Sequence, residues 1–170
     1  SKAKGEWILI LDADEEVGKD LGREIEKETK NPRADYYRIP RKNIIFGKWM
    51  RHTYWWPDYQ IRFFKKGFVS WGDEIHSLPL TRGKGADFPA KEKLAIIHHN
   101  YNFLDQYIER LFRYTKIQAE EMMKNGYVFN WPDVIKKPLD EFLRRFFDGK
   151  GYQDGVHGLV LSLLPSFSEF

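Results

Sequence analysis

The feature that most constrains this chain is an unbroken apolar run, Trp7 to Leu11, which stops abruptly at a cluster of acids. A short run of this kind, rich in Ile and Leu, is typical of a strand buried on both faces of a sheet. Ligands of open α/β sheets gather beyond the carboxyl ends of the strands. Asp12 and Asp14 follow at that end, so in an extended segment both side chains point the same way. Such a pair can hold a hard divalent cation against a phosphate.

Other interpretations of the acidic cluster can be tested on the sequence. The acids can simply cap the helix that follows them. A calcium EF-hand loop that begins at Asp12 requires Gly at its sixth place and Glu at its twelfth, where this chain has Val17 and Arg23. A phosphatase of the haloacid type has Thr or Val at the fifth place, which here is Glu16. A two-metal nuclease needs acids at neighbouring strand ends, and it stays open through Asp58, Asp73 and Glu74.

The composition excludes several classes of protein. The chain has 170 residues, 42% of them hydrophobic and 31% charged, which suits one globular domain with its own core. The formal net charge of +3 is too small to indicate a nucleic-acid partner. Because cysteine is absent, a disulfide scaffold and a thiolate metal site are both excluded. The first residues show no signal-peptide pattern, and no apolar run approaches the ~20 residues that span a bilayer.

Two helices are predicted from apolar stripes. Val17, Leu21 and Ile25 are spaced four apart, which predicts a helix with the acids at its N-terminus and Asn31-Pro32 at its end. Residues 103–124 are the strongest helix, and Gly126 is its expected stop. The stripe of this second helix is expected to pack on the sheet, and its members are Leu104, Ile108, Leu111, Phe112 and Thr115.

Strands are predicted between these helices. The expected strands cover 36–39, 43–46 and 59–64, and residues 68–71 are expected to return as a hairpin on the last of them. Residues 81–91, with two Gly and one Pro, predict a flexible loop. A short buried strand over 94–97 ends at His98 and His99. A histidine at that strand end, near Asp14 in the folded sheet, can complete a metal site.

Basic and aromatic residues alternate between the predicted strands. This mixture is found in proteins that bind single-stranded nucleic acid, and equally in a sheet that buries its aromatics and exposes a basic face. Arginine suits phosphate because its planar fork donates two hydrogen bonds at once. The residues concerned are Arg41, Lys42, Lys48, Trp49, Arg51, His52, Tyr54, Trp55, Trp56 and Arg62.

The last region predicts a basic helix with an aromatic face. Pro138 suits the first turn of a helix. A basic helix of this kind is typical of a membrane-interfacial segment, and a helix that docks on a missing half of the protein or on a second copy of the chain is the alternative. The apolar stripe is Leu139, Phe142, Leu143, Phe146 and Phe147, flanked by Lys136, Lys137, Arg144 and Arg145.

Several short segments, in order, resemble the family 2 glycosyltransferases of the GT-A fold, and more narrowly the branch with lipopolysaccharide core transferases. The first resembles the Asp-x-Asp segment of that family and covers residues 5–15. The others cover residues 39–41, 57–64, 75–76, 98–101 and 151–155, so the resemblance extends over nearly the whole chain. It implies an α/β fold, a partial GT-A (Rossmann-like) nucleotide-diphospho-sugar transferase fold with C-terminal amphipathic helices.

The resemblance also implies roles for individual residues. Asp12, Asp14 and Arg62 would bind a nucleotide-sugar donor, with Asp14 and His98 as ligands of Mg²⁺ or Mn²⁺. In a transferase the aromatic residues Trp55 and Trp56 would contact the sugar of a lipopolysaccharide or other glycolipid acceptor. The base of an inverting transfer would be Asp73, Glu74 or His76. Relatives often have Glu directly after this histidine, and Ser77 stands there instead, so the identity of the base stays open.

The resemblance covers the second half of a transferase. GT-A enzymes bind the nucleotide base with a β-α-β unit ahead of the Asp-x-Asp strand, so we expect an N-terminal half to be missing here. Residues 1–126 would be the metal and acceptor half, and residues 127–170 a helical extension. The expected location is cytoplasmic and peripheral on the inner face of the plasma membrane, with a homo-oligomer or the missing half as partner and no nucleic acid. The alternative is a non-catalytic module that binds a membrane surface or a protein through its aromatic and basic face.

Overall fold

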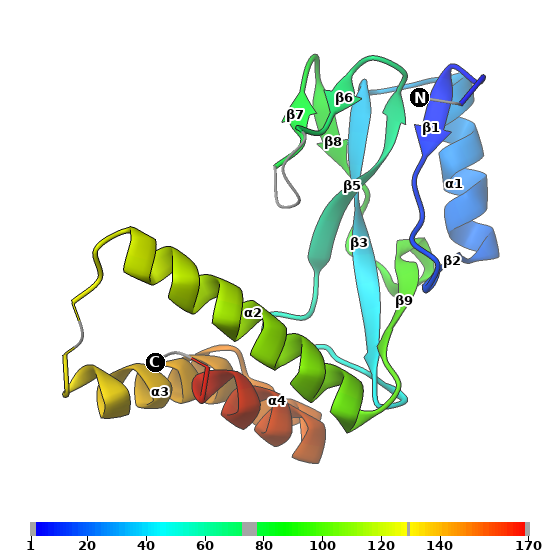
Figure 1. Ribbon diagram of the computed structural model, residues 1–170. Helices are drawn as coiled ribbons and strands as arrows, with labels where there is room; N and C mark the ends of the chain where they lie inside the picture. Colours follow the sequence, from blue (N-terminus) through cyan, green and yellow to red (C-terminus); the bar gives the residue numbers. More distant parts are fainter. Residues whose placement is uncertain (1–2, 73–77, 129, 169–170) are drawn as a thin grey trace. The chain divides into compact units, whose positions relative to one another are not determined.

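The computed structural model describes residues 3–72, 78–128 and 130–168 (Figure 1). The chain divides into two compact units, of which unit 1 comprises residues 1–43 and 57–99 and unit 2 comprises residues 44–56 and 100–170. The long helix α2 (Leu104–Lys124) therefore belongs with the C-terminal helices, although the sequence analysis grouped it with the strands. The proposed functional boundary at residue 126 stays a prediction.

Unit 1 is built on a mixed sheet with the strand order β1-β5-β3-β9-β2. β5 is antiparallel to both β1 and β3, β2 is antiparallel to β9, and β8 is parallel to β3. The strands are β1 (Trp7–Leu9), β2 (Glu15–Val17), β3 (Tyr36–Ile45), β5 (Asp58–Lys65), β8 (Gly85–Asp87) and β9 (Ile96–Tyr101), of which β3 and β9 end in unit 2. A separate pair is formed by β6 (Val69–Ser70) and β7 (Leu80–Thr81), and a short 3-10 helix, η1 (Glu92–Leu94), precedes β9.

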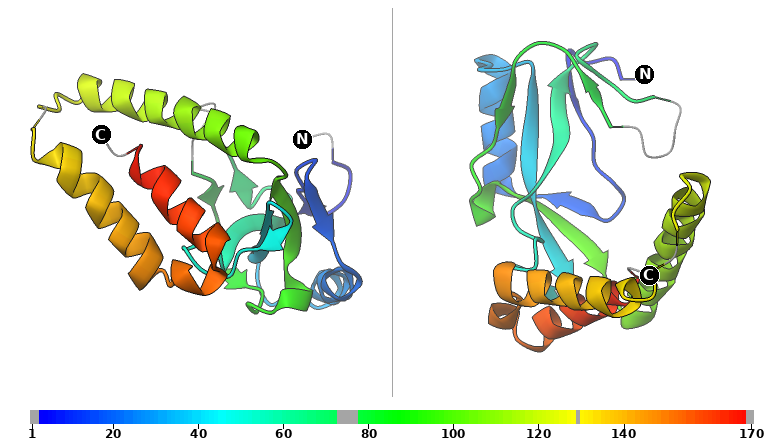
Figure 2. Two further views of the ribbon diagram at one scale, coloured as in Figure 1. Left: turned by 90° about the horizontal axis from the view of Figure 1, so that it is seen from below. Right: turned by 90° about the vertical axis from the view of Figure 1, so that its left-hand side faces the viewer.

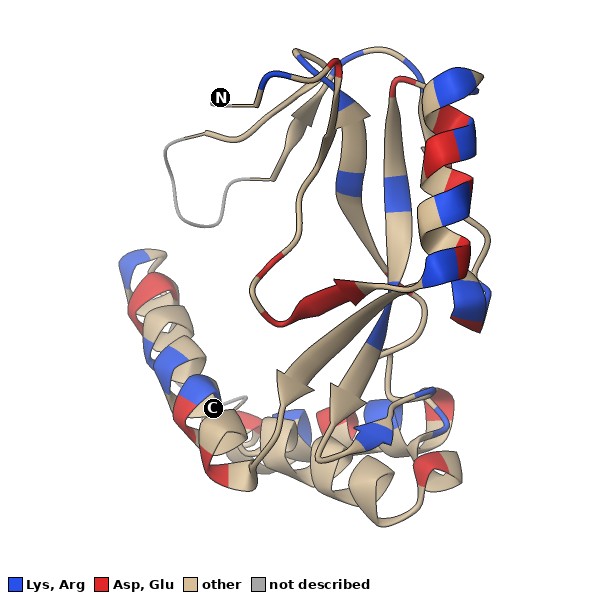
Figure 3. Ribbon diagram, turned by 90° about the vertical axis from the view of Figure 1, so that its right-hand side faces the viewer, with Lys and Arg blue, Asp and Glu red and all other residues tan. Residues whose placement is uncertain are grey.

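The core of unit 1 lies between the sheet and α1 (Lys19–Lys30). Leu21 of the helix is completely buried, and Ile25 packs one turn later against the same cluster. The sheet supplies Tyr37 and Phe63, whose rings stack with centroids 5.4 Å apart. The opposite side of α1 carries alternating acidic and basic residues (Figure 3). The predicted row of apolar residues thus accounts for how α1 packs.

β1 does not have the predicted double-sided burial. It is an edge strand that pairs with β5 alone, and Leu9 and Leu11 are 37% and 40% exposed. An apolar run records that a segment is hydrophobic, but the number of neighbouring strands is decided by the sheet. The prediction that this strand is buried on both faces is wrong for this structure.

Four other local predictions also differ from the structure. Glu15 to Val17 form a strand, β2, so α1 begins later than the apolar spacing indicated. β3 continues through Pro40 as one strand, in which Pro40 lies opposite Tyr59 of β5. β6 pairs with β7 rather than folding back on β5, and β8 occupies part of the predicted 81–91 loop.

Unit 2 is mainly helical. In the left view of Figure 2, α4 lies between α2 and α3, and α4 makes extensive contacts with α3. The elements are β4 (Lys48–Trp49), α2, α3 (Asp133–Leu143), a π-helical turn η2 (Arg144–Asp148), a 3-10 helix η3 (Gly151–Asp154) and α4 (Val156–Ser166). Its core includes Ile45, Met50, Tyr107 and Leu161.

The helix α2 matches its predicted bounds, but its predicted stripe is only partly buried. Gln106 accepts hydrogen bonds from the first backbone N–H groups, and Gly126 adopts a positive φ of 75° beyond the end. Leu104 and Phe112 are 46% and 70% exposed, whereas Tyr107 is buried. Tyr107 enters the core of unit 2, and of the predicted row Leu111 packs against it.

The last predicted helix is displaced. α3 starts after Pro132, and Pro138 lies inside the helix rather than in its first turn. Leu139, Leu143 and Phe147 are 51%, 41% and 55% exposed, while Phe142 stacks on Phe146. Within the described residues, no helix has both the length and the apolar character needed to cross a membrane.

Candidate functional site

A charged network in unit 1 is centred on Glu15, whose side chain is fully buried. Its carboxylate accepts hydrogen bonds from Arg62 Nη2 at 2.7 Å and from the backbone N–H of Asp12 at 3.1 Å. Arg41 Nη1 lies 3.4 Å from the same carboxylate. Arg62 also pairs with Asp12, and its pKa is raised because the hydrogen bonds and charges of these acids outweigh the opposing effect of burial. A buried carboxylate needs such partners to stay ionised.

The network continues from Arg41 to Asp58, which lie opposite each other on β3 and β5. Asp58 accepts hydrogen bonds from Arg41 Nε at 2.8 Å, Asn43 Nδ2 at 3.1 Å and Gln60 Nε2 at 3.0 Å. Burial alone would raise the pKa of Asp58, but the hydrogen bonds and the positive charge of Arg41 outweigh it and lower that pKa. Asp58 is therefore an ionised acceptor at neutral pH.

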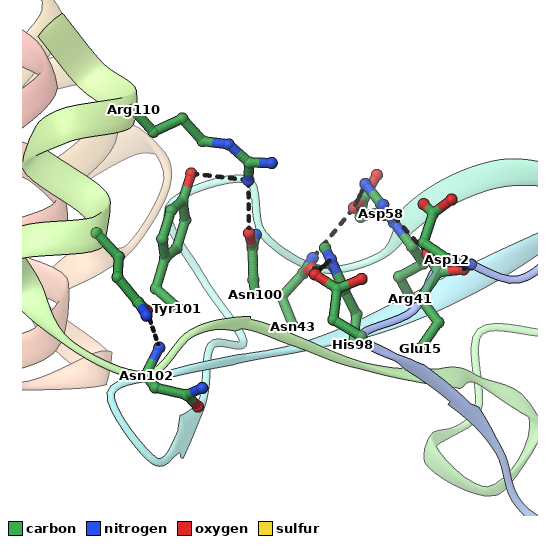
Figure 4. Close-up of polar contacts among 12 residues, drawn as sticks. Asp12, Glu15, Arg41, Asn43, Asp58, His98, Asn100, Tyr101, Asn102 and Arg110 are labelled. Atoms are coloured by element: carbon green, nitrogen blue, oxygen red, sulfur yellow. Dashed lines mark hydrogen bonds and ion pairs between the residues drawn. The ribbon is translucent and has the colours of Figure 1, made fainter. Parts of the chain in front are cut away.

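An ionised Asp58 orients the next two side chains. It can only accept hydrogen bonds, so Asn43 presents its amide N–H to Asp58 and its oxygen to His98. The 2.7 Å contact between Asn43 Oδ1 and His98 Nδ1 therefore requires a proton on Nδ1. In the neutral ring, Nε2 then carries a lone pair. Figure 4 shows this row of side chains from Asp58 to His98.

His98 Nε2 faces the carboxylate of Asp14, with 3.5 Å between Nε2 and Oδ2. Burial and the positive charge of Arg41 lower the pKa of His98, so the ring is neutral at pH 7 and above. Two lone-pair donors thus face each other. Four carboxylates, those of Asp12, Asp14, Glu15 and Asp58, meet two guanidiniums, so the network carries a net negative charge that suits a cation.

Asp14 and His98 could supply part of the coordination shell of a divalent cation. Asp14 is 45% exposed, and His98 donates from Nδ1 to an amide oxygen, as metal-ligating histidines commonly do. No group of three or more His, Asp or Glu side chains within the described residues has the arrangement of a complete metal site. Mg²⁺ commonly takes one or two carboxylates and completes its shell with water and substrate phosphates. The residues present suit a site of that open kind.

The structure brings together four of the residues singled out in the sequence. Asp12 contacts Arg62, and Asp14 contacts His98. The two aspartates have different partners because residues 13 and 14 form a turn, so the expectation that they extend in parallel is wrong. The candidate bases Asp73, Glu74 and His76 lie outside the described residues.

The two candidate acceptor tryptophans lie in unit 2. Trp55 lines a cavity of about 420 Å³, and Trp56 packs edge-on against Trp49 with ring centroids 5.2 Å apart. Five aromatic side chains and two arginines contribute to the cavity wall. The complete lining is Thr53, Tyr54, Trp55, Tyr101, Tyr107, Arg110, Leu111, Tyr114, Gln118, Arg145, Pro165 and Ser168.

Glu15 and Asn43 had no predicted role, Arg41 belonged only to the predicted basic and aromatic mixture, and Asp58 was a candidate only for the nuclease alternative. A usable signal was present, because Arg41 and Asn43 are two apart, as are Asp58, Gln60 and Arg62. Residues two apart share one face of a strand. That polar face could be found in the sequence, but its opposing strand could not.

The chain is similar over nearly its whole length to curated proteins of Rickettsia. It is 25% identical to an uncharacterized glycosyltransferase of Rickettsia conorii, over 97% of this chain and 62% of that protein. Uncharacterized glycosyltransferases of Rickettsia typhi and Rickettsia prowazekii are also 25% identical, each over 100% of this chain and 61% of their own length. The chain thus spans about three fifths of the length of these relatives.

These likenesses support a glycosyltransferase relationship in general terms. No family model matches the chain. No solved structure matches it either. The mixed α/β architecture of unit 1 is compatible with the expected α/β fold.

Proposed function

We propose that this chain is part of a glycosyltransferase that moves a sugar from a nucleotide-sugar donor to a lipopolysaccharide or other glycolipid acceptor. The proposed enzyme belongs to family 2, has the GT-A fold, inverts the sugar and requires Mg²⁺ or Mn²⁺. The names of the relatives support the general class. The observation that carries the site is the pair of facing lone-pair donors, Asp14 Oδ2 and His98 Nε2, in a network with excess negative charge.

Asp14 and His98 would hold the cation in this proposal. When bound, the cation neutralises the diphosphate leaving group. Asn43 keeps the lone pair of His98 on Nε2, and Asp58 keeps Asn43 in that orientation. These two residues position a ligand without touching the substrate.

Asp12 and Arg62 would form the donor-contacting side of the site. Arg62 is held by both Asp12 and Glu15, so its guanidinium is fixed before a donor arrives. Arg62 Nε is buried and has no hydrogen-bond partner among the described residues. The proton of the acceptor hydroxyl would pass to Asp73, Glu74 or His76, as the resemblance implies.

Calorimetric titration with Mn²⁺ tests the cation site without requiring turnover. The Asp14→Ala variant is expected to lose measurable binding, and His98→Gln to weaken it at least about tenfold, since each removes one of two protein ligands. Asn43→Leu is expected to weaken Mn²⁺ about 10- to 100-fold, because the ring of His98 loses its tautomer control.

The matched control is Asp20→Ala. Asp20 is a half-exposed aspartate on α1, and its partner is Arg23 of the same helix. The affinity of the Asp20→Ala variant for Mn²⁺ should equal that of the unchanged chain. If Asp14→Ala and Asp20→Ala bind Mn²⁺ equally, the assigned cation site is wrong. Loss of sugar transfer in Asp14→Ala, measured in a protein that also carries the expected N-terminal half, then tests the reaction itself.

A further inference from the structure

Unit 2 contains a cavity of about 420 Å³ whose wall is mostly aromatic and polar. Ligand pockets usually measure about 300–1,000 Å³, so the cavity is large enough for a small molecule. Its aromatic side chains come from three places in the chain, which are the 53–55 segment, the end of β9 and the helix α2. The packing of unit 2 therefore assembles this wall.

The charged side chains of the wall already have partners within the chain. Arg145 pairs with Glu141, which is 9% exposed. Arg110 donates to the oxygens of Asn100 and Tyr101 (Figure 4). No Asp or Glu lines the cavity among the described residues. A ligand therefore meets mainly neutral hydroxyl and amide groups together with aromatic rings.

Several hydroxyl groups of the wall can accept a hydrogen bond from a ligand but not donate one. Thr53 Oγ1 and Ser168 Oγ each donate to a nearby backbone oxygen at 2.6 Å. Tyr54 Oη donates to the backbone oxygen of Arg144 at 3.3 Å. A hydroxyl group has one proton and two lone pairs, so these three groups keep only acceptor capacity. The wall therefore favours a ligand with several donors.

Tyr107 adds a hydroxyl group without a partner. The residue is 6% exposed, and its ring packs edge-on against Tyr101 and Phe46 with centroids 5.0 and 6.3 Å apart. Within the part of the chain that the structure describes, its hydroxyl makes no hydrogen bond. Burial raises the pKa of Tyr107 to about 12, so the hydroxyl stays protonated at neutral pH. A buried polar group without a partner is costly, and a ligand in the cavity can relieve that cost.

The ring of a neutral sugar combines the required features. Its hydroxyl groups all donate, and they surround C–H faces that pack against aromatic rings. A carboxylate or a phosphate brings mainly acceptors, which cannot bond to hydroxyl groups that have already used their proton. A purely aromatic ligand fits the ring faces but brings few donors.

We propose that the cavity of unit 2 binds the ring of a neutral sugar, with one sugar hydroxyl bonded to Tyr107 and others donating to Thr53, Tyr54 or Ser168. In the proposed transfer reaction this ring would belong to the acceptor, and that assignment rests on the proposed function. The binding itself depends on unit 2 alone and requires neither donor nor cation.

The probes are the methyl α- and β-pyranosides of glucose, galactose, mannose and N-acetylglucosamine, each titrated calorimetrically into the 170-residue chain. At least one of them is expected to bind at a single site with a Kd of about 1 mM, as suits a ligand of this size. The tightest should bind at least about fivefold more tightly than the weakest, because a change of one stereocentre loses a hydrogen bond. Glycerol and p-cresol are the control ligands, since glycerol lacks the ring and p-cresol lacks the donors.

Tyr107→Phe removes the hydroxyl group and keeps the ring contacts. It should weaken the tightest glycoside about 3- to 10-fold, because one hydrogen bond to the ligand is lost. The urea midpoint of unfolding should not fall, since the hydroxyl has no partner among the described residues. A purely structural tyrosine would give the opposite pair of results.

Tyr114→Ala removes one aromatic face of the cavity. Tyr114 is 47% exposed on α2, and alanine is a good helix former, so the variant should fold, which circular dichroism checks. It should weaken the glycoside about 3-fold or more. The matched controls are Tyr152→Phe and Tyr152→Ala, because Tyr152 is 51% exposed in unit 2 and does not line the cavity. Both should bind the glycoside like the unchanged chain.

Four results would overturn the proposal. They are the absence of saturable binding by every glycoside, tighter binding of p-cresol or glycerol than of any glycoside, an unchanged affinity in Tyr107→Phe, and equal weakening in the Tyr152 controls. A fall in the stability of Tyr107→Phe would show that its hydroxyl has a partner in the chain and would also count against it. Failure here would leave the Mn²⁺ titration of Asp14 unaffected, so this proposal and the cation site are tested separately.

Discussion

Each unit contains a buried carboxylate, and arginine side chains dominate around one whereas backbone N–H groups dominate around the other. Glu15 of unit 1 is held by the side chains of Arg62 and Arg41, and each of these also binds a second acid. Asp154 of unit 2 accepts hydrogen bonds from the backbone N–H groups of Arg51 and His52, at 3.2 and 2.9 Å, and its other oxygen contacts His52 Nδ1 at 3.0 Å. Glu15 belongs to a network in which each arginine also binds a second acid, whereas Asp154 is a single anchor for the backbone of residues 51 and 52.

This difference distinguishes a candidate binding site from a contact that stabilises the fold. Asp154 connects the 48–52 segment to η3, and Lys48 Nζ donates to its backbone oxygen at 2.6 Å. Two of the hydrogen bonds to its carboxylate come from backbone N–H groups, which cannot move without the backbone. The Glu15 network instead leads through Arg41, Asp58 and Asn43 to His98 and the half-exposed Asp14. Excess charge near the surface is available for a ligand, whereas a backbone anchor contributes stability.

The largest effect is expected where η3 meets α4. A Cβ on Gly158 would lie 1.8 Å from the backbone oxygen of Gly151 and 3.1 Å from Asp154 Cβ. Gly158→Ala should therefore destabilise the chain by about 3 kcal/mol or more, because two backbones would have to separate. Urea denaturation followed by circular dichroism measures this change.

The matched substitution in unit 1 is Gly22→Ala in α1. An added Cβ at Gly22 meets nothing within 4 Å, and alanine is the better helix former. This variant should gain about 0.5–1 kcal/mol in free energy of unfolding. Destabilisation of similar size at both glycines would contradict the close approach at Gly158.

The next largest effect is expected from substitutions of Asp154 itself. Asp154→Ala leaves the N–H groups of Arg51 and His52 without their acceptor and should cost about 2–3 kcal/mol of stability. Asp154→Asn keeps one acceptor oxygen and should cost less. In both variants Mn²⁺ affinity should be unchanged, and a change in that affinity would show that the two carboxylates are not separate in function.

Glu15→Gln should destabilise the chain less than Asp154→Ala does, and it should weaken Mn²⁺ binding more. The expected loss is about 1.5 kcal/mol, because Arg62 keeps Asp12 and Arg41 keeps Asp58 as partners. Removal of one negative charge from the network should also lower the affinity for Mn²⁺ measurably. A loss of stability larger than that of Asp154→Ala would argue against a network with shared partners.

The smallest effect is a dependence of stability on pH. The folded state lowers the pKa of His98 below its ordinary value of 6.5, so the unfolded chain takes up this proton first. Stability from this group is complete above pH 6.5 and is lost as pH falls towards the folded pKa. Urea denaturation at pH 7.5, 6.5 and 5.5 should show that decline. His98→Gln should flatten it, and an unchanged slope in this variant would show that another group is responsible.

Much of the local structure followed from sequence pattern alone. The stripe at Leu21 and Ile25 predicted how α1 packs, and the bounds of α2 matched because helical hydrogen bonds are local. The acids after the Trp7 to Leu11 run were expected near a histidine at a strand end, and Asp14 does contact His98. Residues close in sequence, or at the ends of recognisable elements, carry this information.

The tertiary structure alone decided how these elements are paired. The position of β1 at the sheet edge, the register that sets Arg41 opposite Asp58 and the orientation of Asn43 depend on which strands are neighbours. Asp154 meets the backbone of His52 across 102 positions of sequence. A strand pattern shows which face is polar but not which strand lies beside it, because the pairing energy comes from contacts between distant segments.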